Sequence, residues 1–336
     1  MQAYPVKYSE FTCFKDILNE GKYIDHLDEK SKKKAKDELY EDPKERDAAL
    51  KQFRDWIVAQ PHYSVCNDDT FLLAFLRRCK YSQLEARTMF DIFHSATYKK
   101  TPEWMVDIDT QSKTIRALAD TRCLLPLPIR DHEGRRIILW KPGGFNANTK
   151  KTPYNGETLF QLWGIFLYLL QREDMTQVNG YVFWHDGAGM TIPHITYVGA
   201  DKFKNVIKVF YNNFPARIKK VVYYNCGAIM DAMMTVISPV LSQKIKDRFV
   251  VRSSMEEVYK KDIPMECLPR EYLPDDYKGK CYGTTNEMHA KFWDQTREPA
   301  IQKKIWDLSH NYFKVDEKKR PDADIPQAAF RKLNVD

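Results

Sequence analysis

Four short apolar runs after Pro126 constrain the fold of the chain more than any other feature. They are rich in β-branched and aromatic residues and lie at residues 137–140, 181–184, 221–224 and 249–251. Runs of this kind suit strands that are buried on both faces of a sheet. Stretches with helical periodicity separate them, at residues 157–172, 201–213 and 228–241. Strands that alternate with helices predict an α/β fold with a mostly parallel sheet.

The first 120 residues have a different, helical texture. Leu50, Phe53 and Ile57 approximate a helical stripe that ends before Pro61, and residues 82–85 form a Ser-x-x-Glu capping pattern. We therefore expect an N-terminal helical bundle over residues 1–120 and an α/β domain over residues 121–280. Residues 281–336 form a C-terminal extension, for which we expect partial helix.

The positive charge of the chain is concentrated in one segment. The formal net charge is +7, and residues 201–252 alone hold ten Lys or Arg against three Asp. A localised basic face indicates partners that carry phosphate, which are lipid headgroups or nucleic acid. A solvated basic face without any partner is the alternative.

Residues 228–241 carry a single charge, Asp231, and three methionines within five positions. Methionine gives a surface that adapts to changing contacts. Pro239 interrupts the segment, and residues 242–248 follow at once with a basic face formed by Lys244, Lys246 and Arg248. This pattern predicts a mobile apolar lid helix that covers a hydrophobic pocket and enters an acidic membrane surface, although a core helix would have the same pattern. The expected lid residues are Ile229, Met230, Met233, Met234, Val236, Ile237, Val240 and Leu241.

Signals for catalysis are weak. Gly187 and Gly189 follow an expected strand, but no glycine stands at position 192, and the chain holds no phosphate-binding loop of the NTPase kind. His185 and Asp186 are neighbours on a strand and point to opposite faces, so they do not form one catalytic pair. We expect His185 to be a buried, hydrogen-bonded histidine, and we expect no enzyme activity, no cofactor and no metal site.

The seven cysteines are scattered and form no Cys-x-x-Cys pair, which argues against a zinc site and a disulfide framework. We therefore expect a cytoplasmic protein. Its longest apolar stretch, residues 159–170, is too short to span a bilayer, which needs ~20 residues. Any contact with a membrane is then transient and peripheral.

Four motifs, in order, resemble those of the CRAL-TRIO lipid-binding family. They are the Asp-x-Phe-Leu-Leu helix at residues 69–81, the Asn-Gly strand at 179–189, the Phe-Pro stretch at 214–219 and the Ile-x-Pro segment at 237–248. The resemblance is strongest to the tocopherol and retinaldehyde carriers of the family. It implies an N-terminal helical module, a lipid-binding domain with a hinged helix over its pocket, and no catalysis. We expect a monomeric intracellular carrier for an isoprenoid-type lipid (tocopherol, retinoid or carotenoid), with no nucleic-acid partner.

The resemblance also implies site residues. Trp163 and Leu167 stand where the tocopherol-binding members have small hydroxyl residues, so the pocket should be bulkier and less polar there. The expected lipid pocket comprises Phe160, Trp163, Leu167, Tyr181, Phe183, His185, Val198, Phe203, Val206, Val209, Phe210 and Ile218.

Phosphoinositide contacts in the family fall here on Arg217, Lys219, Lys244 and Arg248. A fifth basic position of the family is Cys79, and we expect its neighbours Arg78 or Lys80 to compensate. A signalling adaptor that recognises phosphoinositides without transferring lipid remains the alternative function.

Overall fold

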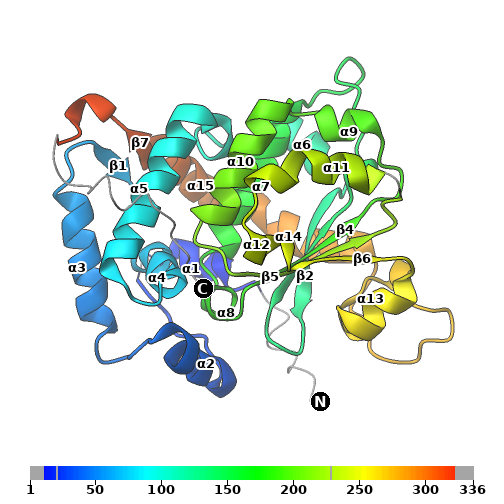
Figure 1. The fold of residues 1–336 in the computed structure, drawn as a ribbon, viewed down its shortest axis with the longest axis horizontal. Coiled ribbons are helices and arrows are strands. Elements are labelled where there is room, and N and C mark those ends of the chain that lie inside the picture. The colour runs from blue at the N-terminus through cyan, green and yellow to red at the C-terminus, as the bar shows by residue number, and fades with distance from the viewer. Residues whose placement is uncertain (1–10, 20–21, 228, 322–336) are drawn as a thin grey trace.

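The computed structural model describes residues 11–19, 22–227 and 229–321, and a five-stranded sheet lies at its centre (Figure 1). The strand order is β2 (Leu124–Arg130), β3 (Arg136–Trp140), β4 (Tyr181–Asp186), β5 (Ile218–Tyr224), β6 (Phe249–Arg252). Only the β2–β3 pair is antiparallel within this sheet, and the other three pairs are parallel. The predicted α/β fold with a mostly parallel sheet is therefore confirmed.

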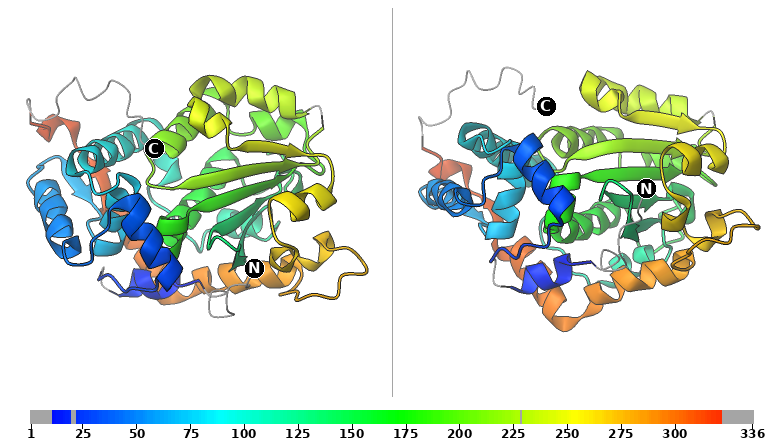
Figure 2. Two further views of the ribbon diagram at one scale, coloured as in Figure 1. Left: turned by 60° about the horizontal axis from the view of Figure 1, so that its bottom comes forward. Right: turned by 90° about the horizontal axis from the view of Figure 1, so that it is seen from below.

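Both faces of the sheet are buried along β3, β4 and the second half of β5, as their apolar runs predict. The run at residues 249–251 was wrongly expected to be buried on both faces, because β6 is an edge strand and Val251 is 58% exposed. Phe183 and Val221 point into one hydrophobic core, while Val182 and Val222 point into a second core on the opposite face. Helices α7 (Gly156–Leu170) and α10 (Ala200–Asn212) cover the first face. Helices α13 (Met255–Lys261) and α14 (Thr285–Trp293), yellow and orange in Figure 2, cover the second.

The N-terminal part is the expected bundle of helices. Asp68 accepts a hydrogen bond from the backbone N–H of Phe71 at 2.7 Å, and Ser82 accepts one from that of Glu85 at 3.4 Å. Side-chain caps therefore begin the helices at residues 69–78 and 83–100. The helices before the sheet are α1 (Cys13–Leu18), α2 (Glu29–Leu39), α3 (Arg46–Val58), α4 (Asp69–Arg78), α5 (Gln83–Lys100) and α6 (Lys113–Ala119). The remaining helices are α8 (Asp174–Asn179), α9 (Ile192–Thr196), α11 (Ile229–Ile237), α12 (Gln243–Lys246) and α15 (Pro299–Asn311).

The C-terminal segment is built into both parts of the protein. Strand β7 (Phe313–Val315) pairs antiparallel with β1 (Tyr63–Val65) of the helical part. Trp293 on α14 donates a hydrogen bond from its Nε1 to the backbone carbonyl of Leu124 on β2 at 3.2 Å. The partial helix expected here is present as α14 and α15.

Within the described residues, no helix combines the length and apolar character needed to cross a bilayer.

Candidate functional site

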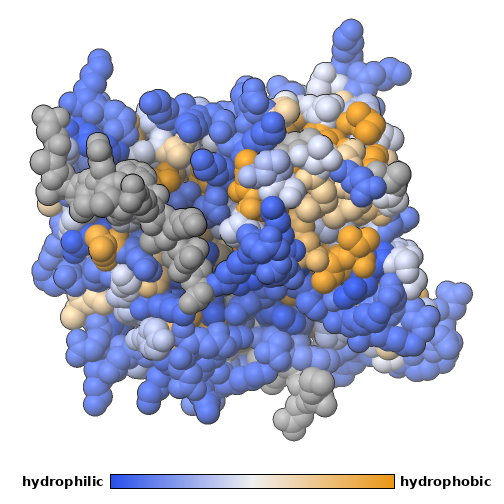
Figure 3. All heavy atoms as spheres, viewed as in Figure 1, coloured by the Kyte–Doolittle hydropathy of each residue, from blue (hydrophilic) through white to orange (hydrophobic). Residues whose placement is uncertain are grey.

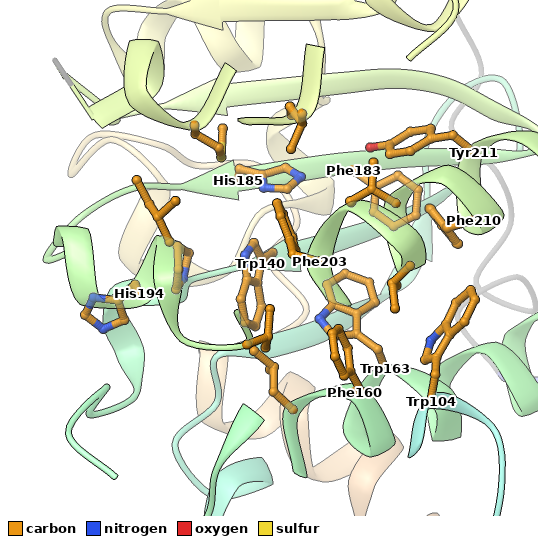
Figure 4. Close-up of a pocket in the computed structure, with 18 of the residues that line it drawn as sticks. Trp104, Trp140, Phe160, Trp163, Phe183, His185, His194, Phe203, Phe210 and Tyr211 are labelled. Carbon is orange, nitrogen blue, oxygen red and sulfur yellow. The ribbon is translucent and has the colours of Figure 1, made fainter. Parts of the chain in front are cut away.

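An apolar cavity with an empty volume of about 1110 Å³, part of it open to solvent, lies between the sheet and helices α7, α10 and α11 (Figure 4). Ligand sites in proteins are commonly cavities of this kind, lined mostly by apolar and aromatic side chains. The lining residues are Trp104, Trp140, Pro142, Leu159, Phe160, Trp163, Leu167, Phe183, His185, Met190, His194, Ile195, Val198, Phe203, Val206, Ile207, Phe210, Tyr211, Tyr223, Met233 and Ile237.

The cavity is lined by residues near the carboxyl ends of the parallel strands, which is where ligands bind in sheets of this kind. Trp140 on β3 is paired in register with His185 on β4, which is paired in turn with Tyr223 on β5. Residues paired in register point to the same face of a sheet. The three side chains therefore form one row across the cavity wall.

Helix α7 supplies the facing wall. Phe160, Trp163 and Leu167 lie at helical spacing on its cavity side, and a capping box between Asn155 and Thr158 begins the helix. Its other faces are buried in the core, which explains why the helix is apolar on nearly every side.

Gly164 on α7 brings Trp104 into the cavity wall. A Cβ atom at position 164 would lie 2.1 Å from the carbonyl oxygen of Trp104, so only glycine permits this approach. The contact fixes the backbone of Trp104, whose indole lines the cavity.

Helices α10 and α11 close the cavity. Phe203, Val206 and Phe210 form the apolar stripe of α10 on the cavity side, as the sequence pattern suggested. From α11, Met233 and Ile237 reach the cavity.

Nine of the twelve expected pocket residues line the cavity. Tyr181 and Ile218 do not, because they begin β4 and β5 and so lie at the amino ends of the strands, whereas the cavity is lined nearer the carboxyl ends. The Tyr181 hydroxyl instead donates to Gln171 at 3.1 Å. Val209 lies on the flank of α10 and is buried in the protein core.

The expected lid residues divide into three groups. Met233 and Ile237 line the cavity. Met230 and Leu241 are buried in the protein core, and Ile229, Met234 and Val240 are partly exposed. The side chain of Val236 lies outside what the structure describes.

Ten lining residues were not predicted. Ile207 continues the α10 stripe, and Trp140 and Tyr223 follow from strand alternation once the pairing register is known. The unpredicted lining residues are Trp104, Trp140, Pro142, Leu159, Met190, His194, Ile195, Ile207, Tyr211 and Tyr223.

No Asp, Glu, Lys or Arg is among these lining residues. Burial lowers the pKa of His185 to about 3, so its imidazole is neutral at physiological pH. The hydrogen bond expected for His185 is absent among the described residues, since its ring faces the cavity and contacts Tyr223 at a centroid distance of 4.5 Å. His194, by contrast, is bonded to the carbonyl oxygen of Phe145 at 2.9 Å.

A second feature is a group of cations beside the amino end of β5. Arg78, Arg217, Lys219 and Arg248 influence one another electrostatically, and Lys34 on α2 joins them. We call these five residues the basic cluster. The Glu38 carboxylate forms ion pairs with two of its members, at 2.7 Å from Arg217 and 3.7 Å from Lys219.

Burial and the neighbouring positive charges lower the pKa values of cations in the basic cluster. Burial and then the charge of Arg217 lower the pKa of Lys219 to about 8. Burial lowers the pKa of Arg78 as well, with further contributions from Arg248 and Arg217. An anion placed among these groups would relieve their repulsion.

The other expected phosphoinositide contacts lie elsewhere. The Lys80 ammonium lies 5.9 Å from the ring centroid of Tyr40, and Lys244 is on α12, four residues before Arg248. The Cys79 side chain is buried, with its sulfur 3.8 Å from that of Met89. Lys34 and Glu38 were missed because α2 is far from β5 in the sequence.

Two protein families match the chain. Residues 122–272 match the CRAL/TRIO domain family, and residues 42–115 match the family described as Pinta-like, UBA domain.

Among similar proteins, the alpha-tocopherol transfer protein-like protein of Homo sapiens is 28% identical over 275 residues, which cover 81% of this chain and 75% of the relative. Clavesin-1 of Xenopus laevis is 27% identical and covers 70% of each chain. Clavesin-2 of Mus musculus is 25% identical, covering 71% of this chain and 72% of the relative. Among solved structures, Sfh5 aligns at 11% identity with a TM-score of 0.41, covering 76% of this chain and 91% of that one.

Proposed function

We propose that this chain, whose residues 122–272 match the CRAL/TRIO domain family, carries one hydrophobic molecule and exchanges it at acidic membrane surfaces. The observation that carries the proposal is the cavity over the sheet, whose lining holds aromatic and aliphatic side chains and no charged residue. Such a cavity favours an apolar guest over water. The proposal includes no chemical step and no cofactor.

Burial of apolar surface supplies the affinity. Enclosing ~300 Å² of cargo surface at ~25 cal/mol per Å² contributes about 7 kcal/mol before the costs of association. That is enough to hold a lipid in water, and it is lost when the cavity opens into a bilayer. A cover that opens is therefore sufficient for release.

The proposed cargo is an isoprenoid-type lipid of the tocopherol, retinoid or carotenoid class. The wall contains three tryptophans, Trp104, Trp140 and Trp163, and their flat faces suit a rigid ring or a conjugated chain. The name of the human relative, alpha-tocopherol transfer protein-like, is consistent with this class. The bulk of Trp163 and Leu167 favours a slender molecule.

The proposed membrane contact lies beside the cover of the cavity. Apolar side chains gather on the face formed by α9, α11 and β6 (Figure 3), where Ile192 is 56% exposed and Val251 is 58% exposed. Patches of this kind mark surfaces that meet partners or membranes. We propose that α11 acts as the lid, that the apolar patch enters the bilayer and that the basic cluster with Lys244 holds phosphoinositide headgroups.

Native mass spectrometry of the protein mixed with a lipid extract tests the carrier function. We expect one apolar ligand per chain, and its loss in Val206→Trp, because the larger side chain fills the cavity. Val58→Trp, at a 70% exposed position on α3, is the matched control. Absence of any stoichiometric apolar ligand would contradict the proposal.

Transfer between vesicles separates a carrier from a phosphoinositide-binding adaptor. A carrier moves a fluorescent lipid from donor to acceptor vesicles, and acidic acceptors accelerate the transfer. An adaptor binds the acidic vesicles but moves no lipid.

A further inference from the structure

A polar cleft lies where α3, α4 and α15 meet the segment before α2. Its empty volume is about 820 Å³, part of it open to solvent. The lining residues are Lys22, Arg54, Cys66, Asn67, Asp68, Asp69, Lys304, Leu308 and Tyr312. None of them lines the apolar cavity over the sheet, so the cleft is separate from the proposed cargo site.

The cleft is also separate from the basic cluster. Asp69 begins α4 and lines the cleft, whereas Arg78 ends α4 and belongs to the basic cluster. An α-helix rises about 1.5 Å per residue, so roughly 14 Å separate the two ends of this helix. An anion in the cleft is therefore out of reach of the residues expected to hold phosphoinositide headgroups.

Three cations line the cleft, and two of them are unpaired. Among the described residues, no ion pair or hydrogen bond holds the ammonium groups of Lys22 and Lys304. Arg54 donates from Nε to the backbone carbonyl of Asn67 at 3.1 Å and pairs with Asp69 through Nη2, which leaves Nη1 outside both contacts. The three cations belong to the segment before α2, to α3 and to α15, so they approach a ligand from different directions.

The two carboxylates of the cleft already have partners. Asp68 pairs at 2.7 Å with Arg172, whose side chain is 1% exposed and lies behind the lining. Asp69 pairs with Arg54. The acidic groups are thus neutralised within the protein, whereas the two lysines are not. A lining with unused charged donors favours an anion that accepts hydrogen bonds.

Two neutral polar side chains complete the lining. Within the described part of the chain, the amide of Asn67 and the hydroxyl of Tyr312 make no hydrogen bond. Both groups donate and accept, as the hydroxyls of a polyol do. They therefore suit a ligand that carries hydroxyls beside its charged group.

From this arrangement we propose that the cleft binds a phosphorylated polyol, with its phosphate groups held by Lys22, Arg54 and Lys304. A phosphate group has three oxygens that accept strong hydrogen bonds, so it can meet cations that come from three directions. A carboxylate has only two, in one plane. The ligand is either a soluble inositol phosphate or the headgroup of a lipid, and the proposal is independent of the carrier function.

Calorimetric titration of the full-length protein with inositol trisphosphate, inorganic phosphate and citrate tests the ligand class. Citrate carries a similar charge on carboxylates. We expect inositol trisphosphate to bind about tenfold or more tightly than citrate, and inorganic phosphate to bind more weakly than inositol trisphosphate because it makes fewer contacts. Bound ligand should also raise the melting temperature of the protein, since it binds the folded state.

Variants assign the binding to the cleft. Lys22→Gln with Lys304→Gln removes two unpaired cations, so the melting temperature of the free protein should be unchanged while affinity for inositol trisphosphate falls about tenfold. The matched control is Lys51→Gln with Lys303→Gln, which removes the same charge at exposed lysines of α3 and α15 outside the cleft. The control should keep the affinity of the parent protein.

Vesicles separate the two sources of the ligand. Phosphatidylcholine vesicles that contain phosphatidylinositol bisphosphate are sedimented with the parent protein and with both double variants. If the variant of Lys22 and Lys304 weakens binding of free inositol trisphosphate alone, the ligand is soluble. If it weakens binding of the vesicles as well, a lipid headgroup reaches the cleft. Both results support a phosphate site.

Four results overturn the proposal. They are no binding of inositol trisphosphate by the parent protein, unchanged affinity in the variant of Lys22 and Lys304, an equal loss in the control, and binding of citrate as tight as that of inositol trisphosphate. Lys219→Gln identifies the basic cluster as the binding site if it alone reduces affinity. None of these results bears on the apolar ligand of the cavity.

Discussion

The Glu38 carboxylate on α2 lies 2.7 Å from the Arg217 guanidinium, so the protein supplies its own anion to the basic cluster. Partial burial alone would raise the pKa of Glu38, but the hydrogen bond from Arg217 and the charge of Lys219 lower it. Glu38 is therefore ionised at neutral pH. A lipid phosphate that approaches Arg217 and Lys219 must compete with this carboxylate.

Removing the competing charge should strengthen binding to acidic membranes. For Glu38→Gln we expect an affinity for phosphoinositide vesicles about two- to fivefold higher, because a half-exposed ion pair is worth ~0.5–1 kcal/mol. Vesicle sedimentation measures the change. Asp37→Asn alters the charge equally on the same helix, where Asp37 pairs with Lys33. An equal increase in both variants would assign the effect to net charge instead of competition.

The pKa of Lys219, lowered to about 8, predicts a pH dependence of the same binding. A phosphate beside Lys219 favours its charged form, so the bound state keeps a proton that the free protein loses above pH 8. Affinity should thus be full at pH 7 and fall as the pH rises to 9.5, by about fivefold for ~1 kcal/mol. Arginine stays charged over this range, so Lys219→Arg should show a smaller fall in vesicle affinity between pH 7 and 9.5. An identical fall in both proteins would show that Lys219 does not cause the pH dependence.

Truncating two basic residues near β6 should weaken binding of the protein to acidic membranes without changing its affinity for cargo. The double variant Lys244→Ala with Arg248→Ala loses about 2 kcal/mol of attraction to an acidic leaflet, or roughly thirtyfold in affinity. Neither residue lines the cavity, so cargo affinity should persist. Arg248 also donates to the carbonyl oxygen of Ile218, so thermal unfolding must be checked. The control is the double variant Lys278→Ala with Lys280→Ala, which removes the same charge at two exposed lysines before α14. If the control weakens membrane binding equally, Lys244 and Arg248 have no site-specific role in docking.

The main features of the fold were predictable because local patterns determine them. The parallel strands are continuous apolar runs, and Asp68 and Ser82 act as the caps that their positions predict. Strand β2 was not predicted, because Pro126 and Pro128 cannot donate to a strand ladder and so argue against a strand. Its place at the edge of the sheet, paired only with β3, accommodates both prolines.

The residues of the cavity and of the basic cluster could be predicted only where they lie on one helix or strand with a recognisable pattern. The apolar stripe of α10 indicated that Phe203, Val206 and Phe210 share one face, and all three line the cavity. Trp104 depends on the close approach of Gly164, sixty residues later, and no local pattern reveals such a contact. The pairing of Glu38 with Arg217 spans 179 residues and has the same cause.

The bulk of Trp163 should determine which cargo fits. Its ring contacts those of Trp140 and Phe183 at centroid distances of 5.6 Å and 6.2 Å, on the cavity wall that α7 supplies. Trp163→Ser widens the cavity at this wall and should favour lipids with a bulkier ring. Competition between ligands in native mass spectrometry measures this change. Because one side of the indole already faces the cavity, we expect a loss of unfolding free energy of about 3 kcal/mol, at the lower end for buried tryptophan. Trp306→Ser, at a 39% exposed position, should cost less than ~1 kcal/mol and leave ligand preference unchanged. If Trp163→Ser lowers stability but retains the parent's order of ligand affinities, Trp163 supports the cavity without selecting its cargo.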